Sequence, residues 1–206
     1  ILIDKNINCL AYKYSDEFIK CSIYAPEKVI LQLQILIKQK NIIPDGIICL
    51  GTDVPLTCAI VAKKLNLISV PIKAAKITTN KILIKKIFEK IKINTPKYFS
   101  TKSKKSAFKY IKNKKLPIII KPDDSRGSRG VGILWKYSMF DCLFNEAKKM
   151  SSKNIVIIEE FIDGIQISSE SIVYKSKATT PGFSDRNYEY ISQSRSNIIE
   201  NGGDLP

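Results

Sequence analysis

The residue types best suited to chemistry stand together between Leu116 and Gly132. A run of apolar residues there predicts a buried strand, and Lys121 stands at its end. Lysine is rarely buried without a partner, so its place in an apolar strand needs a reason. The glycines of the following loop would let backbone N–H groups turn toward an anion. The pattern therefore predicts a phosphate-binding loop, and a tight hairpin turn is the alternative that needs no ligand.

Side chains in the same loop agree with phosphate as the ligand. Ser125 and Ser128 offer hydroxyl donors, and Arg126 and Arg129 add positive charge beside Lys121. No Gly-Lys-Ser or Gly-Lys-Thr follows the glycines, and the GxGxxG spacing is absent. The loop is therefore neither a Walker loop nor a dinucleotide-binding fingerprint.

A second group of polar residues comes downstream, after an apolar strand that begins at Ile155. This strand ends in Glu159 and Glu160, which alone would be typical of a solvated strand end. After a turn, an alternating strand would place Gln166 and Glu170 on one face. Because the two acids follow the lysine and its loop in the same region of the chain, they favour a binding site over a simple turn.

Two residue types narrow the chemistry. The chain has no histidine, which excludes from it a Ser-His-Asp triad, a Cys-His dyad and a histidine-ligated metal. Its five cysteines lie far apart without a CxxC pair, which predicts buried free thiols in a reducing cytoplasm. Chemistry in this chain must use lysine, arginine, carboxylates and backbone amides.

Together, the two stretches resemble the ATP-grasp superfamily. The shared pattern is a strand with Lys121–Pro122, a glycine- and serine-rich loop, a helix, and a strand that ends Glu-Glu-Phe-Ile with a glycine two residues on. Upstream, Thr79-Asn80-Lys81 and Thr95–Pro96 are similar to the family's entry segment. The resemblance covers essentially the whole chain, and the loop SRGSRGV is most similar to carbamoyl-phosphate-synthetase-like carboxylate–amine ligases.

The resemblance implies a role for each matching residue in binding ATP. Lys121 would contact the α- and β-phosphates, Lys81 would reach the phosphates from the other side, and residues 125–131 would form a flap over the β- and γ-phosphates. Glu159 would lie near the adenine amino group, and Phe161 belongs to the segment that frames adenine. The residues assigned to the nucleotide site are Lys81, Lys121, Ser125, Gly127, Ser128, Arg129, Gly130, Val131, Glu159, Glu160, Phe161, Ile162 and Gln166.

One position departs from the family pattern. Where the family has a glutamate that accepts hydrogen bonds from both ribose hydroxyls, this chain has Gln166, whose amide oxygen would accept one. The departure keeps open an alternative function, a non-catalytic nucleotide-binding module with a degenerate site. The family's Mg²⁺ ligands would lie downstream of Pro206, so no metal ligand and no catalytic residue is assigned within the chain.

The function implied by the resemblance is ATP-dependent ligation of a carboxylate to an amine, or a similar nucleophile, through an acylphosphate. ATP and Mg²⁺ would be the cofactors, and small carboxylates and amines the substrates. A carbamoyl-phosphate-like synthetase half and a biotin-carboxylase-like enzyme remain as alternatives, and a homodimer is compatible with the family. Arg186 is interpreted first as a surface arginine and second as a contact for the substrate carboxylate.

The elements that must position these residues follow an α/β rhythm. Strands are expected at 1–3, 18–23 and 46–50, with helices at 27–39 and 54–65, which predicts a Rossmann-like domain with a parallel sheet. Asp53 is expected to cap the second helix, with a ligand contact as the alternative. We assign this pre-ATP-grasp domain to residues 1–75.

Residues 76–206 are expected to form α+β ATP-grasp subdomains. After an irregular connection at 68–79, helices are expected at 80–91, 102–115 and 139–150. Strands are expected near Tyr98, at 118–120, at 155–158 and at 165–174. Leu83, Ile87 and Ile91 would form the apolar stripe of the first of these helices. The chain begins without methionine and stops at a loop-like sequence, so we expect both natural ends to lie outside it.

The net charge of +15 permits two interpretations. Clustered lysines would indicate a nucleic-acid or anionic-membrane partner. Here the basic residues are dispersed over helix faces without interleaved stacking aromatics, so neither partner is expected. The expected location is the cytoplasm, because there is no signal peptide and no apolar run of membrane-spanning length.

Overall fold

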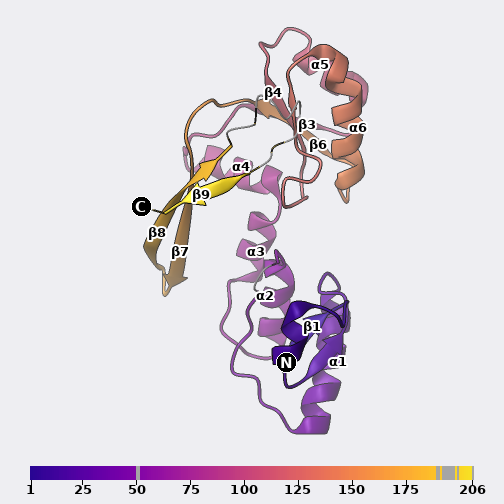
Figure 1. Ribbon diagram of the computed structural model, residues 1–206, viewed down its shortest axis with the longest axis vertical. Coiled ribbons are helices and arrows are strands. Elements are labelled where there is room, and N and C mark those ends of the chain that lie inside the picture. The colour runs from indigo at the N-terminus through magenta and orange to yellow at the C-terminus, as the bar shows by residue number, and fades with distance from the viewer. Residues whose placement is uncertain (50–51, 189–190, 192–197, 199, 206) are drawn as a thin grey trace. The chain divides into compact units, whose positions relative to one another are not determined.

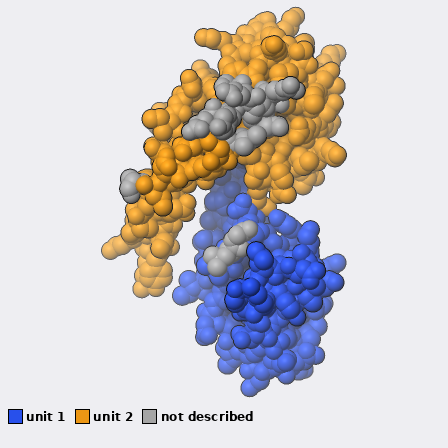
Figure 2. Space-filling model, in the orientation of Figure 1, with its two compact units in different colours: residues 1–84 blue, residues 85–206 orange. Residues whose placement is uncertain are grey.

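The computed structural model describes residues 1–49, 52–188, 191, 198 and 200–205. The chain has two compact units, Ile1–Ile84 and Lys85–Pro206, coloured separately in Figure 2. Each unit is described by itself. The helices and strands (Figure 1) are β1 Leu2–Asp4, the 3-10 helix η1 Leu10–Tyr14, β2 Phe18–Lys20, α1 Pro26–Lys40, α2 Pro55–Lys64, α3 Ile72–Thr78, α4 Lys81–Lys90, β3 Tyr98–Thr101, α5 Lys104–Ile111, β4 Ile118–Pro122, β5 Gly132–Leu134, the 3-10 helix η2 Tyr137–Met139, α6 Phe140–Met150, β6 Val156–Glu160, β7 Gln166–Tyr174, β8 Lys177–Asn187 and β9 Gly202–Asp204.

The first unit contains the parallel pair β1 and β2, with Leu2 opposite Phe18. α1 begins at Pro26, whose fixed φ suits the first helical position, and ends at Lys40, with Asn41 capping it in the left-handed conformation. The buried core of this unit joins β2, α1 and α2 through Ile19, Val29, Leu33 and Val61. The mixture of helices and strands with a parallel pair confirms the predicted α/β class of this part.

Two expectations for residues 1–64 of this unit are wrong. Residues 46–49 form no strand, and the remaining residue of that expected strand, 50, lies outside the described residues. An apolar run shows which residues avoid water, but it does not supply the ladder partner that a strand needs. The N-cap of α2 is Val54 rather than Asp53, with no side-chain cap hydrogen bond. Pro55 fixes the first helical position, so the residue immediately before it must be the cap.

The expected connection at 68–79 contains a helix, α3, with Ala75 buried. Seven residues are too few to display helical periodicity clearly, which explains the error. The helix expected at 80–91 is present as α4, but its expected stripe is not the buried face, because Leu83 and Ile91 are exposed. The buried residue of α4 is Lys85.

The second unit is built on a four-stranded antiparallel sheet in the order β3-β6-β4-β5. Ile118 of β4 pairs with Glu160 of β6 on one side and with Leu134 of β5 on the other. β5 was not expected from the sequence, and its pairing with β4 makes the glycine-rich segment a hairpin connection. The antiparallel sheet agrees with the predicted α+β character of this region.

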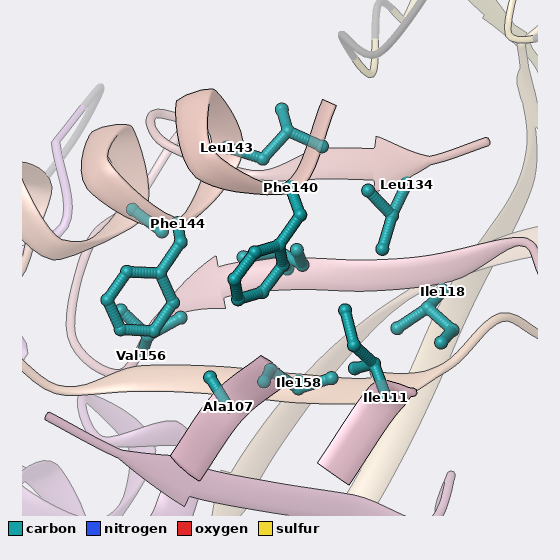
Figure 3. Close-up of a cluster of buried hydrophobic side chains, with 11 residues drawn as sticks. Ala107, Ile111, Ile118, Leu134, Phe140, Leu143, Phe144, Val156 and Ile158 are labelled. Atoms are coloured by element: carbon teal, nitrogen blue, oxygen red, sulfur yellow. The ribbon is translucent and has the colours of Figure 1, made fainter. Parts of the chain in front are cut away.

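Helices α5 and α6 cover one face of this sheet (Figure 3). Ser103 caps α5 by accepting a hydrogen bond from the Ser106 amide. Figure 3 shows Phe140 and Phe144 of α6 lying over the strands, with Ile111 of α5 nearby. The strand residues that complete this core are Ile118, Ile120, Leu134, Val156 and Ile158.

A separate antiparallel sheet has the order β7-β8-β9. Gln166 of β7 pairs with Arg186 of β8, and the register shifts between Glu170 and Ile172. β8 was missed because its sequence lacks the alternation of apolar and polar residues that marks a half-buried strand. Most residues of these strands are exposed.

The five cysteines are free, but none is fully buried and Cys142 is exposed, contrary to the expectation of buried thiols. Burial, followed by the neighbouring Cys49 thiol, raises the pKa of Cys58 to about 11. Over the described residues, no helix combines the length and apolar character needed to cross a bilayer.

Candidate functional site

The two faces of the β3-β6-β4-β5 sheet differ in chemistry because side chains alternate along each strand. Ile118 and Ile120 of β4 point into the core under α5 and α6. Lys121 therefore projects from the opposite face, and the same alternation along β6 places Glu159 there as well. We call this surface the Lys121 face.

Lys121 and Glu159 form an ion pair between neighbouring strands. The Lys121 Nζ donates a hydrogen bond to the Glu159 Oε1, and the Glu159 side chain is only 8% exposed. The sequence predicted both residues for one site, and the structure brings them together. Pairing explains how an apolar strand can carry a lysine.

A third charged residue, Lys85 of α4, completes this cluster. Its Nζ lies 2.8 Å from the Glu159 Oε2, as an ion pair rather than an aligned hydrogen bond. The same ammonium group donates to the Thr95 Oγ1 at 3.0 Å and to the Pro96 carbonyl at 3.2 Å. The Lys85 side chain is 7% exposed, so the group is almost completely removed from water.

Tyr98 lies beside Lys85, whose Nζ is 5.0 Å from the centre of the phenol ring. Burial, followed by the neighbouring Glu89 carboxylate, raises the pKa of Tyr98. The phenol therefore stays neutral at physiological pH, and its ring presents an electron-rich face to the ammonium group.

Sequence reasoning missed Lys85, although a signal was available. Lys85 is three residues from both Ile82 and Phe88, a spacing that places all three on neighbouring positions of one helix face. The structure buries Lys85 on that side, while Leu83 of the expected stripe is exposed. A lysine within an apolar helix stripe therefore marked a buried ion pair.

The Lys85–Glu159–Lys121 cluster has one more positive than negative charge. Removing two ammonium groups from water carries a large desolvation cost, and one carboxylate offsets only part of it. A bound anion would neutralise the excess positive charge. A phosphate oxygen suits this role because it accepts hydrogen bonds from an ammonium group. The cluster is therefore suited to an anion that approaches Lys121.

The glycine-rich loop 123–131 continues directly from β4. Its backbone has positive φ at Gly127, Ser128 and Gly130, with values of 59°, 53° and 71°. The amides of Arg129 and Val131 donate within the loop, to the carbonyls of Arg126 and Ser128. The turn conformation is therefore stabilised by the loop's own backbone.

Both ends of the loop are held against the C-terminal end of α6. The buried Asp123 accepts a hydrogen bond of 2.7 Å from the Ser151 hydroxyl, and Asp124 accepts from the Ser152 amide at 3.1 Å. At the other end, a Cβ added to Gly130 would lie 2.8 Å from the Met150 Cβ. The segment between these anchors is the exposed tip at 127–129.

The residues after Glu159 continue from the end of β6. Glu160 exchanges hydrogen bonds with Lys97, whose amide donates to the Glu160 Oε2 at 3.2 Å. The Phe161 ring lies 6.0 Å from the ring of Trp135, and Ile162 is exposed. Trp135 follows β5 and was not assigned a role from the sequence.

The remaining assigned residues belong to other elements of the chain. Lys81 is the first residue of α4 and belongs to the first unit. Gln166 begins β7 and is exposed, opposite Arg186. Arg186 is engaged in an ion pair with Glu200 at 2.9 Å, and hydrogen bonding to Tyr188, followed by the Glu200 charge, raises the pKa of Arg186. The contribution of these residues to the site remains a prediction.

A magnesium ion is a separate question from the nucleotide. Within the part of the chain that the structure describes, no three His, Cys, Asp or Glu side chains are grouped so that they could hold a metal. Mg²⁺ is bound through carboxylates and phosphates, so the described side chains alone do not fit it. The basic cluster and the loop, by contrast, fit a polyphosphate.

Comparison with known proteins identifies relatives. Residues 79–203 match the family described as the phosphoribosylglycinamide synthetase ATP-grasp (A) domain. A D-alanine–D-alanine ligase of Pelagibacter ubique is 35% identical over 121 residues, which cover 57% of this chain and 38% of that protein. A phosphoribosylamine–glycine ligase of Fusobacterium nucleatum is 27% identical over 204 residues, which cover 96% of this chain and 44% of that protein.

Solved structures share the fold. The ADP complex of N5-carboxyaminoimidazole ribonucleotide synthetase has a TM-score of 0.70 at 16% identity, over 92% of this chain and 48% of that one. The phosphoribosylglycinamide synthetase of Anaerococcus prevotii has a TM-score of 0.56 at 22% identity, over 94% of this chain and 44% of that one. The chain spans less than half the length of the curated relatives described above.

Proposed function

Because this chain belongs to the phosphoribosylglycinamide synthetase ATP-grasp (A) domain family, we propose that the protein binds ATP on the Lys121 face and uses it to join a carboxylate to an amine. The observation that carries the proposal is the Lys85–Glu159–Lys121 cluster, which lies where β4 enters the glycine-rich loop. A buried cluster with excess positive charge beside a turn of positive φ is suited to a polyphosphate.

Each part of this site has a proposed task. Lys121 holds the α- and β-phosphates, and loop residues 125–131 close over the β- and γ-phosphates. Glu159 accepts from the amino group of adenine, while Phe161 and Ile162 frame the base. Lys81 and Gln166 are proposed to contact the phosphates and the ribose. The ion pair between the partly exposed Lys121 and the buried Glu159 on adjacent strands supports the tasks proposed for these two residues.

The chemistry follows from charge and exclusion of water. ATP supplies a γ-phosphoryl group that the substrate carboxylate accepts, and an amine then displaces phosphate from the resulting acylphosphate. The ammonium group of Lys121 stabilises negative charge on the phosphates in a site with little water. The loop shields the reacting groups from hydrolysis when it closes. The described residues offer no carboxylate cluster for Mg²⁺, so no step is assigned to the metal.

Calorimetric titration of MgATP into the intact protein tests the proposal. We expect binding in the micromolar range, and we expect Lys121→Ala to weaken it about tenfold or more, equivalent to roughly 1.4 kcal/mol. Lys109→Ala is the matched control, because Lys109 is an exposed lysine of α5, which covers the opposite face of the sheet. This control should bind MgATP like the parent protein.

Turnover is tested next by measuring ADP release with panels of carboxylic acids and amines. Release that requires both substrates supports ligation. Binding of MgATP without release under any pair would instead favour a nucleotide-binding module with a degenerate site. If the parent protein binds no nucleotide at all, the site assignment itself is wrong.

A further inference from the structure

The indole of Trp135 has a donor without an acceptor. Its Nε1 atom is buried, and within the described part of the chain it has no hydrogen-bond partner. A buried N–H group that lacks an acceptor carries the full cost of losing its hydration. Such a group is an indication that a molecule outside the chain supplies the acceptor.

The sheet register places Trp135 on the Lys121 face. Leu134 points into the core beneath α6, so the next side chain along the strand direction leaves from the opposite face. Ile118, the first residue of β4, pairs with Leu134 of β5 on one side and with Glu160 of β6 on the other. Trp135 and Phe161 are the next residues after these two partners, so they flank the start of β4 from its two sides. Their ring centres are 6.0 Å apart with planes at 52°.

This aromatic pair adjoins the charged cluster. Ile119 pairs with Glu159 of β6 and with Ile133 of β5, which is the neighbouring row of the sheet. A flat heterocycle over these rows would meet two aromatic rings, a carboxylate acceptor at Glu159 and an indole donor at Trp135. A purine with an amino group has the complementary features, an N–H donor and ring nitrogens that accept.

We propose that Trp135 contacts the purine base of the nucleotide and donates its Nε1–H to an acceptor on the base. The inference rests on the proposed nucleotide site and adds to it a base-contacting residue at the end of β5. Trp135 packs against one edge of the base with Phe161, and Glu159 accepts from the amino group. Recognition of the base is thereby separated from the phosphate contacts of Lys121.

Trp135 is the sole tryptophan of the chain, so its fluorescence reports on this site directly. In the intact parent protein, we expect saturating MgATP to change the intensity or emission maximum, while magnesium tripolyphosphate, which lacks the base, leaves both nearly unchanged. An unchanged emission at saturating MgATP, with binding verified by calorimetry, would overturn the inference while leaving the proposed function intact. Absence of MgATP binding in the parent protein would overturn both.

Trp135→Phe removes the N–H donor and retains an aromatic ring. We expect the Kd for MgATP to rise about five- to tenfold, while the affinity for magnesium tripolyphosphate, measured by competition, stays the same. Tyr174→Phe, an aromatic change on the exposed strand β7, should alter neither affinity. Equal losses for both ligands would show that Trp135 acts only on the fold, and no loss for either would exclude the donor role. If Trp135→Phe does not fold, the fluorescence of the parent protein decides.

Discussion

Glu159 is paired from two directions, by Lys121 of the neighbouring strand and by Lys85 of α4. This arrangement matters because a buried carboxylate left without a partner is strongly destabilising. If Lys121 binds the phosphates as proposed, Lys85 would continue to neutralise Glu159. The second lysine would therefore allow the first to exchange partners without leaving a buried charge unpaired.

Lys85→Met tests this residue. The substitution keeps an unbranched apolar side chain but removes the donor that the Thr95 hydroxyl and the Pro96 carbonyl share. Because these partly buried acceptors then lack a partner, we expect the free energy of unfolding to fall by about 1–3 kcal/mol. Urea denaturation followed by circular dichroism measures the change.

Lys86→Met is the matched control for Lys85→Met. Lys86 is the next residue on the same helix and is exposed. Its replacement should change stability by less than about 0.5 kcal/mol, as is usual for surface substitutions. Equal effects of the two substitutions would mean that the cluster around Glu159 does not stabilise the fold.

Single residues of the site were predictable to different degrees. Lys121 was evident because a lysine in an apolar strand has to find an anion. Glu159 could be assigned to the site only because it follows Lys121 and the glycine-rich loop along the chain. Lys85 was hidden within a helix whose apolar stripe was placed on the wrong face, and Trp135 was hidden because sequence does not show which donors lack acceptors.

At the scale of elements, the glycine-rich loop depends on α6. Asp123 and Asp124 are tied to the serines that follow this helix, and Gly130 packs against its last turn. The loop is therefore anchored at both ends, and only its tip is free to adjust to a ligand. This anchoring would place the loop amides without ordering the whole segment on binding.

Gly130→Ala tests the anchor. An alanine here would need a left-handed backbone and would bring its Cβ to 2.8 Å from the Met150 Cβ. Gly127→Ala is the control, because Gly127 has a similar φ of 59° but no atom within 4 Å of an added Cβ. We expect a loss of about 1–2 kcal/mol from the backbone at either position and about 1–3 kcal/mol more at Gly130 from the clash. Thermal unfolding measures both, and equal losses would contradict the packing of Gly130 on α6.

The elements that sequence predicted well are those whose burial is one-sided or complete. β4 and β6 stand out as apolar runs, and α6 has a clear apolar stripe. β8 was not predictable, because its hydrogen bonds to β7 form it while its side chains are mostly exposed. The opposite error occurred at 46–49, where apolar residues are present without a strand partner.

At the scale of the whole molecule, the chain carries part of what its relatives contain. It spans less than half the length of the two curated relatives. The boundary between the two compact units falls between residues 84 and 85. The boundary between the pre-ATP-grasp domain and the ATP-grasp domain at residues 75 and 76 remains a proposal. A cytoplasmic location and a homodimer also remain predictions.

Ligand binding should be visible in the stability of the intact protein. A ligand that binds only the folded state at about 100 times its Kd adds about 2.7 kcal/mol of stability. For a domain of this size, such a gain raises the Tm by roughly 5 °C or more. We expect this shift with MgATP and not with Mg²⁺ alone, and Lys121→Ala at the same nucleotide concentration should show a smaller one. An identical shift in parent and variant would place the nucleotide elsewhere.

The alternation of side chains in the second unit has an evolutionary consequence. Along β4 and β6 and just beyond β5, the odd-numbered Lys121, Glu159 and Trp135 carry proposed ligand contacts, while even-numbered residues such as Ile118, Ile120 and Ile158 belong to the core. Point substitutions at the ligand-contacting positions can change what the protein recognises while the packing beneath α5 and α6 stays constant. A one-residue deletion within β4 would instead exchange Ile120 and Lys121 between faces. Substitutions can therefore change which ligand this sheet binds, whereas insertions and deletions would break the alternation of inward-facing and outward-facing side chains that the core needs.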